Sequence, residues 1–243
     1  MPASRPLPAP PPASADNGAT GRPEAPKRRG RPARSSDSGA STRRSELIAI
    51  AARNFRAKGF DATTTRDIAS ESGMQSGSPF YHFKSKGDLL FAVMEEGMQS
   101  ALEGQQQALA ALAQPASAEQ RVHTLALHHL RVLLAPGNDF IAVMLYEQRA
   151  LSDDERQRIN ALKHRYEEAW AQALQELATQ GRLRAPASLV RLMFFGALHG
   201  TLTWYDPDQA LSLPDLAAQF SAVFVDPEGA GAPAASRAAR KRN

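Results

Sequence analysis

The chain has 243 residues, 42% of them hydrophobic, which is enough for one large domain or two modest domains with a buried core. It contains no cysteine, which excludes disulfides and thiolate metal sites and agrees with a reducing cytoplasm. The net charge is unevenly distributed, because residues 1–44 carry +6 whereas residues 87–225 carry −6. A basic front before an acidic body is typical of a protein that binds nucleic acid with one end.

Residues 1–40 are rich in Pro, Ala, Ser and Gly and nearly free of large apolar side chains, so we expect a disordered basic arm. Within it, the sequence KRRGRP at residues 27–32 resembles an AT-hook, which lays arginines such as Arg29 and Arg31 into a narrow A·T minor groove. A generic basic arm that contacts phosphates explains the same residues equally well. Residues 226–243 have a similar composition and are expected to form a disordered tail.

Three short helices are expected within residues 41–86. Apolar residues at helical spacing predict the first over residues 43–58. The second is predicted over residues 66–72, with Thr64 or Thr65 as its N-cap, and the third begins near Ser76. Glycines after the first two helices act as stop signals.

This layout, with a tight turn between the second and third helices, is that of a helix-turn-helix DNA reader. The last helix of such a motif lies in the major groove, and helix starts favour phosphates. We expect DNA contacts from Thr65, Arg66, Gln75, Ser76, Gly77, Ser78, Tyr81, His82 and Lys86. Phe80 and Phe83 are interpreted as core residues of the small bundle.

The pattern stays helical from residue 87 to residue 225, and no window alternates with period two, so the predicted fold is all-α with about nine helices. One short helix is expected over residues 140–149. Capping boxes are expected to open three helices, at Ser85, Ser152 and Ser212, and Ser117 is expected to cap another. The apolar window 189–205 is short for a membrane span, and we expect a helix covered on both sides.

Residues 43–93 resemble, without a gap, the N-terminal domain of TetR-family transcription regulators. The resemblance rests on Ala51, Ala52, Phe55, Lys58, Gly59, Phe60, Thr64, Ile68, Ala69, Ser72, Gly73, Gly77, Tyr81, His82, Phe83, Ser85, Lys86, Leu89 and Leu90. The family usually has an apolar residue and then Tyr where this chain has Pro79 and Phe80. Because Phe80 lacks a hydroxyl, we assign the phosphate contact to Tyr81.

The resemblance implies a homodimer that reads an inverted repeat in double-stranded DNA, with residues 87–225 as a helical domain for ligand binding and dimerisation. A small-molecule effector would spread the two readers and release the DNA. Residues 165–207 resemble, more loosely, a TetR-family subgroup that responds to acyl-CoA thioesters in steroid and fatty-acid breakdown. An effector of the apolar or acyl-CoA type is therefore expected, with no cofactor and no membrane partner.

A ligand pocket is expected where adaptable methionines and aromatic side chains follow the DNA-reading domain. Its candidate residues are Met94, Met98, Phe140, Met144, Leu145, Tyr166 and Trp170. The candidate dimer interface comprises two glycines that allow close helix approach and three large aromatic residues, namely Gly196, Gly200, Trp204, Phe220 and Phe224. The alternatives are ordinary core packing for the pocket residues and packing of both glycines within one subunit.

The predicted function is a ligand-responsive dimeric repressor that acts in the cytoplasm. A DNA-binding activator or architectural regulator without a small ligand is the alternative. An enzyme is disfavoured, because the chain has no phosphate-binding glycine loop, nucleophile elbow or cysteine nucleophile. His123, His128, His129 and His164 match no known metal-ligand spacing, so no metal site is predicted.

Overall fold

A computed structural model describes residues 36–73, 82–135, 137–209 and 211–226. The chain divides into two units, residues 1–36 and residues 37–243, and the description below concerns the second unit. The predicted disordered arm and tail lie outside the described residues, apart from their inner edges, and so does the helix predicted near Ser76.

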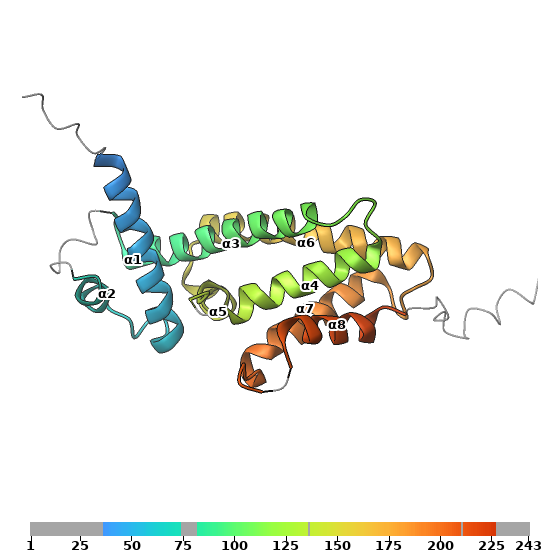
Figure 1. The fold of residues 1–243 in the computed structure, drawn as a ribbon. Helices are drawn as coiled ribbons and strands as arrows, with labels where there is room; N and C mark the ends of the chain where they lie inside the picture. Colours follow the sequence, from blue (N-terminus) through green and yellow to red (C-terminus); the bar gives the residue numbers. More distant parts are fainter. Residues whose placement is uncertain (1–35, 74–81, 136, 210, 227–243) are drawn as a thin grey trace, which may run out of the picture. The chain divides into compact units, whose positions relative to one another are not determined.

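The described residues are all-α, as predicted, with eight α-helices, one short 3-10 helix and an isolated bridge between Leu183 and Val225 (Figure 1). The helices are α1 Ser36–Lys58, α2 Thr65–Glu71, α3 Lys86–Ala110, α4 Ala118–Leu134, α5 Phe140–Tyr146, η2 Gln148–Ala150, α6 Asp153–Thr179, α7 Ala187–Trp204 and α8 Leu213–Phe224. None of them is both long and apolar enough to cross a membrane.

All four serines are N-caps, and the predicted capping box is confirmed at Ser152, whereas Ser85 and Ser212 show only the serine half of the predicted box. Ser117 and Ser152 form reciprocal capping boxes with Gln120 and Glu155, which satisfy backbone N–H groups at the starts of α4 and α6. Ser85 and Ser212 accept the backbone N–H of the residue three positions on. Each such cap is worth about 1 kcal/mol, so local side-chain chemistry explains where these helices begin.

Two predicted helix boundaries are wrong. The first helix starts at Ser36 instead of residue 43, because polar residues extend a helix beyond its apolar stripe when no proline interrupts it. The helix predicted over residues 140–149 ends at Tyr146, and a separate 3-10 turn follows over Gln148–Ala150.

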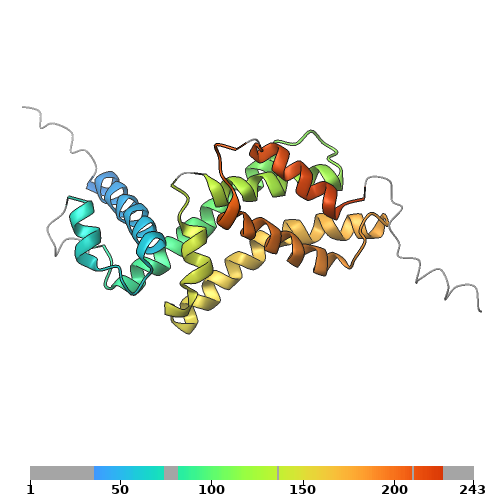
Figure 2. The same cartoon turned by 90° about the horizontal axis from the view of Figure 1, so that it is seen from below.

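The core of the body is built around α4. This helix packs against α3 and α6 and also against α8, while α7 lies along α6 (Figure 2). Val122, Leu125 and Leu130 of α4 are fully buried, and each buried side chain of this size contributes roughly 1.5–3 kcal/mol. The same hydrophobic cluster continues through α3 into α1, so the DNA-reading end and the body share one core.

The expectation that the apolar helix α7 is covered on both sides is wrong within this chain. Val190, Phe194 and Leu198 are buried, but Leu192 and Trp204 are 63% and 55% exposed. The reason is that α4, α6 and α8 all pack against the inner face of α7.

Candidate DNA-binding surface and effector cavity

The start of α2 is held by a reciprocal cap. The backbone N–H of Asp67 donates to Thr64 Oγ1 at 3.1 Å, and the backbone N–H of Thr64 donates to Asp67 Oδ2 at 2.9 Å. Hydrogen bonds from the Thr64 backbone and side chain lower the pKa of the Asp67 carboxyl. Thr64 is therefore the cap, which leaves Thr65 and the exposed Arg66 in the first turn, where an incoming phosphate is favoured.

The helix α2 is fastened to α1 by its last residue. Glu71 accepts hydrogen bonds from Arg53 at 2.8 Å and from Asn54 at 2.7 Å, and these bonds lower the pKa of the Glu71 carboxyl. Ile68 and Phe55 are buried beneath the same contact, as core packing requires. These contacts hold α2, which carries Arg66, in a fixed position on α1.

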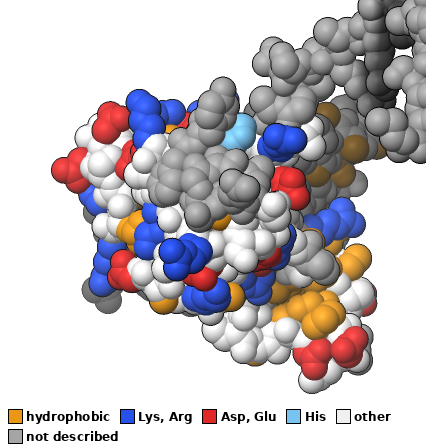
Figure 3. Space-filling model, turned by 90° about the vertical axis from the view of Figure 1, so that its left-hand side faces the viewer, with side chains coloured by type: hydrophobic (Ala, Val, Ile, Leu, Met, Phe, Trp, Pro, Cys, Tyr) orange, Lys and Arg blue, Asp and Glu red, His pale blue; other side chains and the backbone are white. Residues whose placement is uncertain are grey.

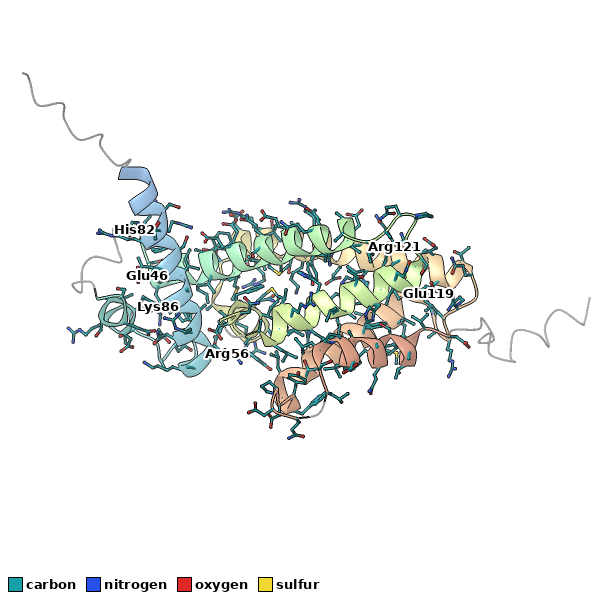
Figure 4. The ribbon with its side chains drawn as sticks, viewed as in Figure 1. Glu46, Arg56, His82, Lys86, Glu119 and Arg121 are labelled. Atoms are coloured by element: carbon teal, nitrogen blue, oxygen red, sulfur yellow. The ribbon has the colours of Figure 1, made fainter. Side chains whose placement is uncertain are left out.

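Lys86 stands at the beginning of α3 and binds the loop between α1 and α2. Its ammonium donates to the carbonyl oxygens of Phe60 at 2.7 Å and Thr63 at 2.9 Å, and it lies 4.3 Å from the centroid of the Phe60 ring. These contacts join the start of α3 to the loop between α1 and α2, and Figure 4 shows where Lys86 lies. A phosphate contact by Lys86 stays a prediction, and it requires the ammonium to share or leave these carbonyls.

Several expected DNA contacts lie outside the described residues, namely Arg29, Arg31, Gln75, Ser76, Gly77, Ser78 and Tyr81. His82 is the first described residue after this stretch and is half-buried. Figure 3 looks at this end of the molecule, where Lys and Arg side chains are exposed and acidic side chains lie among them. The assignment of base and phosphate contacts therefore stays a prediction.

The DNA-reading domain contacts the body through both ends of α5. Arg56, near the end of α1, forms an ion pair at 2.6 Å with Asp139, the residue before α5. The backbone N–H of Phe60 donates to Glu147 Oε1 at 3.1 Å, directly after α5. These contacts have no counterpart in the sequence prediction, because they join residues 83 and 87 positions apart.

The middle of α5 faces a partly open cavity of about 130 Å³ between helices of the body. Its lining residues come from α3, α4, α5, α6 and α7, and they are Met98, Ala101, His129, Ile141, Met144, Leu145, Lys163, Tyr166, Glu167, Arg191, Leu192, Phe195 and His199. The predicted pocket residues Met98, Met144, Leu145 and Tyr166 belong to this set. The cavity is mainly apolar, and its charged side chains are Lys163, Glu167 and Arg191, of which the last two form an ion pair.

Three predicted pocket residues do not line this cavity. Met94 and Trp170 are completely buried in the core. Phe140 is turned the other way, into a hollow between α1 and α3, where its ring packs onto Gly97. Helical spacing identified them as inward residues but did not distinguish a cavity wall from a packed core.

The sequence prediction missed His129 as a cavity residue. It is 3% exposed, and its Nδ1 lies 3.0 Å from the hydroxyl of Tyr166. Burial lowers the pKa of His129 well below its ordinary value, and the nearby His199 and His128 lower it further. Burial also raises the pKa of Tyr166, so the phenol stays protonated and His129 stays neutral. A histidine on the apolar stripe of a helix was the available signal.

The outer face of α7 and α8 carries an exposed apolar strip, which comprises Leu189, Leu192, Met193, Trp204 and Val223. A Cβ added at Gly196 would meet no heavy atom within 4 Å, and one added at Gly200 would meet only Trp204 at 4.0 Å. The alternative in which Gly196 packs against a helix of its own subunit is therefore wrong. Phe220 and Phe224 are half-buried, and the Phe224 ring packs on Phe194 with centroids 4.4 Å apart.

The helix α2 is capped and cross-braced to α1, and the pair is joined to a helical body. This is the layout of helix-turn-helix transcription regulators. Residues 47–93 match the family described as "Bacterial regulatory proteins, tetR family", and residues 115–227 match "Tetracyclin repressor-like, C-terminal domain". The chain belongs to the TetR family. These families consist of transcription regulators, so the protein is a DNA-binding regulator and not an enzyme.

Similar proteins agree with this assignment. The transcriptional repressor KstR2 of Rhodococcus jostii is 29% identical over 196 residues, which cover 78% of this chain and 92% of that protein. A solved structure described as the superantigen PfiT is 35% identical with a TM-score of 0.65, over 77% of this chain and 98% of that one. AibR, solved with isovaleryl coenzyme A and operator DNA, is 22% identical with a TM-score of 0.68 over 75% and 97% of the two chains, a likeness of fold alone.

Proposed function

We propose that the protein is a dimeric transcriptional repressor that binds an inverted-repeat operator and releases it when a small apolar effector occupies the cavity. The observation that supports effector control is the double role of α5. Ile141, Met144 and Leu145 line the cavity, while Asp139 and Glu147 flank the same helix and bind the DNA-reading domain. An effector that displaces the middle of α5 therefore acts on both contacts at once.

The size and charge of the cavity restrict the effector. A dry protein cavity of about 150 Å³ binds benzene, so about 130 Å³ accepts a ring or short acyl group of that size. The lining carries two positive and one negative side chain, from Lys163, Arg191 and Glu167, which favours an anionic group beside them. An acyl-CoA fits if its acyl part occupies the cavity and its phosphates stay outside.

The exposed strip on α7 and α8 supports the dimer. Leu189, Met193 and Gly196 are spaced by four and three residues, so they form one continuous stripe along the outer face of α7. Contiguous apolar surface of this kind marks a protein interface in soluble chains. A second copy pairing through the same strip would form a symmetric interface, as an inverted-repeat operator requires.

The proposal is tested by selecting bound sites from random DNA together with the protein's own upstream region. We expect an inverted repeat. The variant Arg66→Ala should weaken binding and reduce the slope of log affinity against log salt by about one, because one phosphate contact is lost. Arg184→Ala is the matched control, since Arg184 is 73% exposed in the loop before α7 and should leave the slope unchanged.

Release of the selected operator is then measured against a panel of small apolar acids and acyl-CoA thioesters. The repressor proposal expects at least one compound to raise the operator dissociation constant and the melting temperature together. Operator binding that no compound alters would favour the activator or architectural alternative. Absence of an inverted repeat among the selected sites would contradict the dimeric reading of DNA.

A further inference from the structure

One buried polar atom in the cavity has no partner within the described structure. His129 lines the cavity, its Nδ1 is turned to the Tyr166 hydroxyl, and its Nε2 is buried without a hydrogen-bond partner. A buried ring nitrogen left unpaired is costly and calls for an explanation, such as a ligand that supplies the missing partner. Because Tyr166 engages Nδ1, Nε2 is the ring nitrogen left to pair with a ligand, which must displace the side chains that bury it.

The hydrogen-bonding role of His129 Nε2 depends on which ring nitrogen carries the hydrogen. The rings of Phe195 and His199 lie 5.1 and 5.3 Å from the His129 ring, and the Trp170 ring meets it edge-on at 6.3 Å. Such apolar surroundings favour the neutral imidazole, which carries one hydrogen. If the protonated Tyr166 phenol donates to Nδ1, the imidazole hydrogen resides on Nε2, so Nε2 is a donor.

We propose that His129 Nε2 donates a hydrogen bond to an uncharged carbonyl oxygen of the effector, which is a ketone, ester or thioester on an apolar body of about benzene size. This inference rests on the proposed effector role of the cavity. A carboxylate beside His129 would lose its hydration without a positive partner, because the imidazole is neutral. Lys163 and the Arg191–Glu167 pair line the same cavity, where they can hold a charged group of the effector while the neutral His129 pairs with its carbonyl oxygen.

The test uses two ligands of the same shape. Cyclohexanone and methylenecyclohexane differ only in C=O against C=CH₂, and both have about the size that the cavity holds. Their dissociation constants are measured by titration calorimetry with the full chain. A neutral hydrogen bond predicts that cyclohexanone binds on the order of fivefold more tightly than methylenecyclohexane, after allowance for their different transfer from water to cyclohexane.

The variant His129→Phe keeps a ring of similar shape and removes both nitrogens, so the preference for cyclohexanone should vanish. His164→Phe is the matched control, since His164 is an exposed histidine of α6 outside the cavity lining and should keep the preference. If His129→Phe fails to fold, the imidazole ¹⁵N spectrum of the unaltered protein answers the same question. Cyclohexanone should shift the His129 Nε2 resonance, and methylenecyclohexane should leave it in place.

Equal affinity for the two ligands, or an unmoved Nε2 resonance, would overturn the role of His129 while leaving the cavity as an effector site. Binding of neither ligand would overturn it too, because a molecule of this size must then be excluded from the cavity. Operator binding and its release by other compounds are measured separately, so failure of the repressor proposal remains distinguishable from failure of the His129 contact.

Discussion

Gly97 in α3 and Gly196 in α7 stand in similar apolar helices but have opposite surroundings. A Cβ added at Gly97 would lie 2.1 Å from Cγ of Phe140, whereas one added at Gly196 would meet nothing within 4 Å. Gly97 lets α3 approach α5 inside the chain. Gly196 leaves a smooth place on an outer face that the chain does not cover. The same residue type therefore marks an internal contact in one helix and a free surface in the other.

The difference extends to the neighbours of each glycine. Around Gly97, the residues Val93, Met94 and Ala101 are buried against other elements. Around Gly196, Leu192 and Met193 are 63% and 48% exposed. An apolar helix with one buried and one exposed apolar face leaves the second face for a partner, since exposing it to water has no benefit within the monomer.

The largest effect is expected from charge on the outer face. The double variant Met193→Glu with Val223→Glu should raise the dissociation constant of the proposed dimer at least about a thousandfold, because an unpaired buried charge costs several kcal/mol. Both side chains are exposed in one chain, so the fold should persist. Analytical ultracentrifugation measures the mass, and helical circular dichroism checks the fold. Ala171→Glu, on the exposed face of α6, is the control. A dimer that persists in the double variant would show that the uncovered face of α7 is not the dimer interface.

Gly97→Ala should destabilise the monomer fold. The added methyl group overlaps the Phe140 ring and its Cβ at 2.7 Å, and overpacking of this kind costs roughly 1–3 kcal/mol. The melting temperature should fall by about 2–4 °C for each kcal/mol in a chain of this size. Gly196→Ala, at a concentration where the protein is monomeric, should leave it equal or slightly higher. Equal decreases in melting temperature for Gly97→Ala and Gly196→Ala would contradict the contrast between the two glycines.

The free energy of unfolding should also depend on pH, because three histidines of the body are wholly or partly buried. Burial lowers the pKa values of His128, His129 and His199 below 6.5, so the unfolded chain binds more protons than the folded chain under mildly acidic conditions. The free energy of unfolding should therefore fall as the pH drops below about 6.5, by up to about 1.4 kcal/mol per pH unit for each histidine.

Urea unfolding between pH 7.5 and pH 5 measures this slope above the range in which carboxyl groups titrate. His129→Phe should flatten it by up to the share of one histidine. A slope that is the same in the two proteins would mean that His129 is not kept neutral by burial. Substitutions on the outer strip of α7 should leave the slope unaltered in the monomer.

The smallest effect is expected at the exposed ion pair between Arg53 and Glu71, whose side chains are 50% and 42% exposed. Arg53→Ala should lower the free energy of unfolding by less than about 1 kcal/mol, because water screens the pair. Asn54→Ala should cost more, since Asn54 is 6% exposed and bonds both Glu71 and the Ile50 carbonyl oxygen. Thermal unfolding of the two variants side by side decides the order.

The helices of the DNA-reading domain could be predicted from the sequence because their signals are local. Thr64 caps α2 through a residue only three positions away, and the glycines at 59 and 73 adopt the left-handed backbone of helix ends. The block over residues 47–93 also matches the TetR family at many positions. Lys86 shows the limit of this approach, since its binding of the Phe60 carbonyl oxygen joins residues 26 positions apart.

The cavity could be predicted only in part. Met98 and Tyr166 were expected from their apolar character and helical spacing, but the same criteria selected Phe140, which packs onto Gly97 instead. His129 was considered only as a metal ligand and rejected, although its partner is a phenol 37 positions away. Side-chain type and helical period reveal an inward face but not which helix stands opposite.

The sequence by itself determined the all-α class, the serine-capped helix starts and the family of the DNA-reading domain, because these depend on residues within a few turns of one another. Only the tertiary structure decided that α5 joins the cavity to the DNA-reading domain, that His129 Nε2 lacks a partner, and that one face of α7 is uncovered. Those properties depend on which helices meet, and the meeting of helices is set by packing of the whole core.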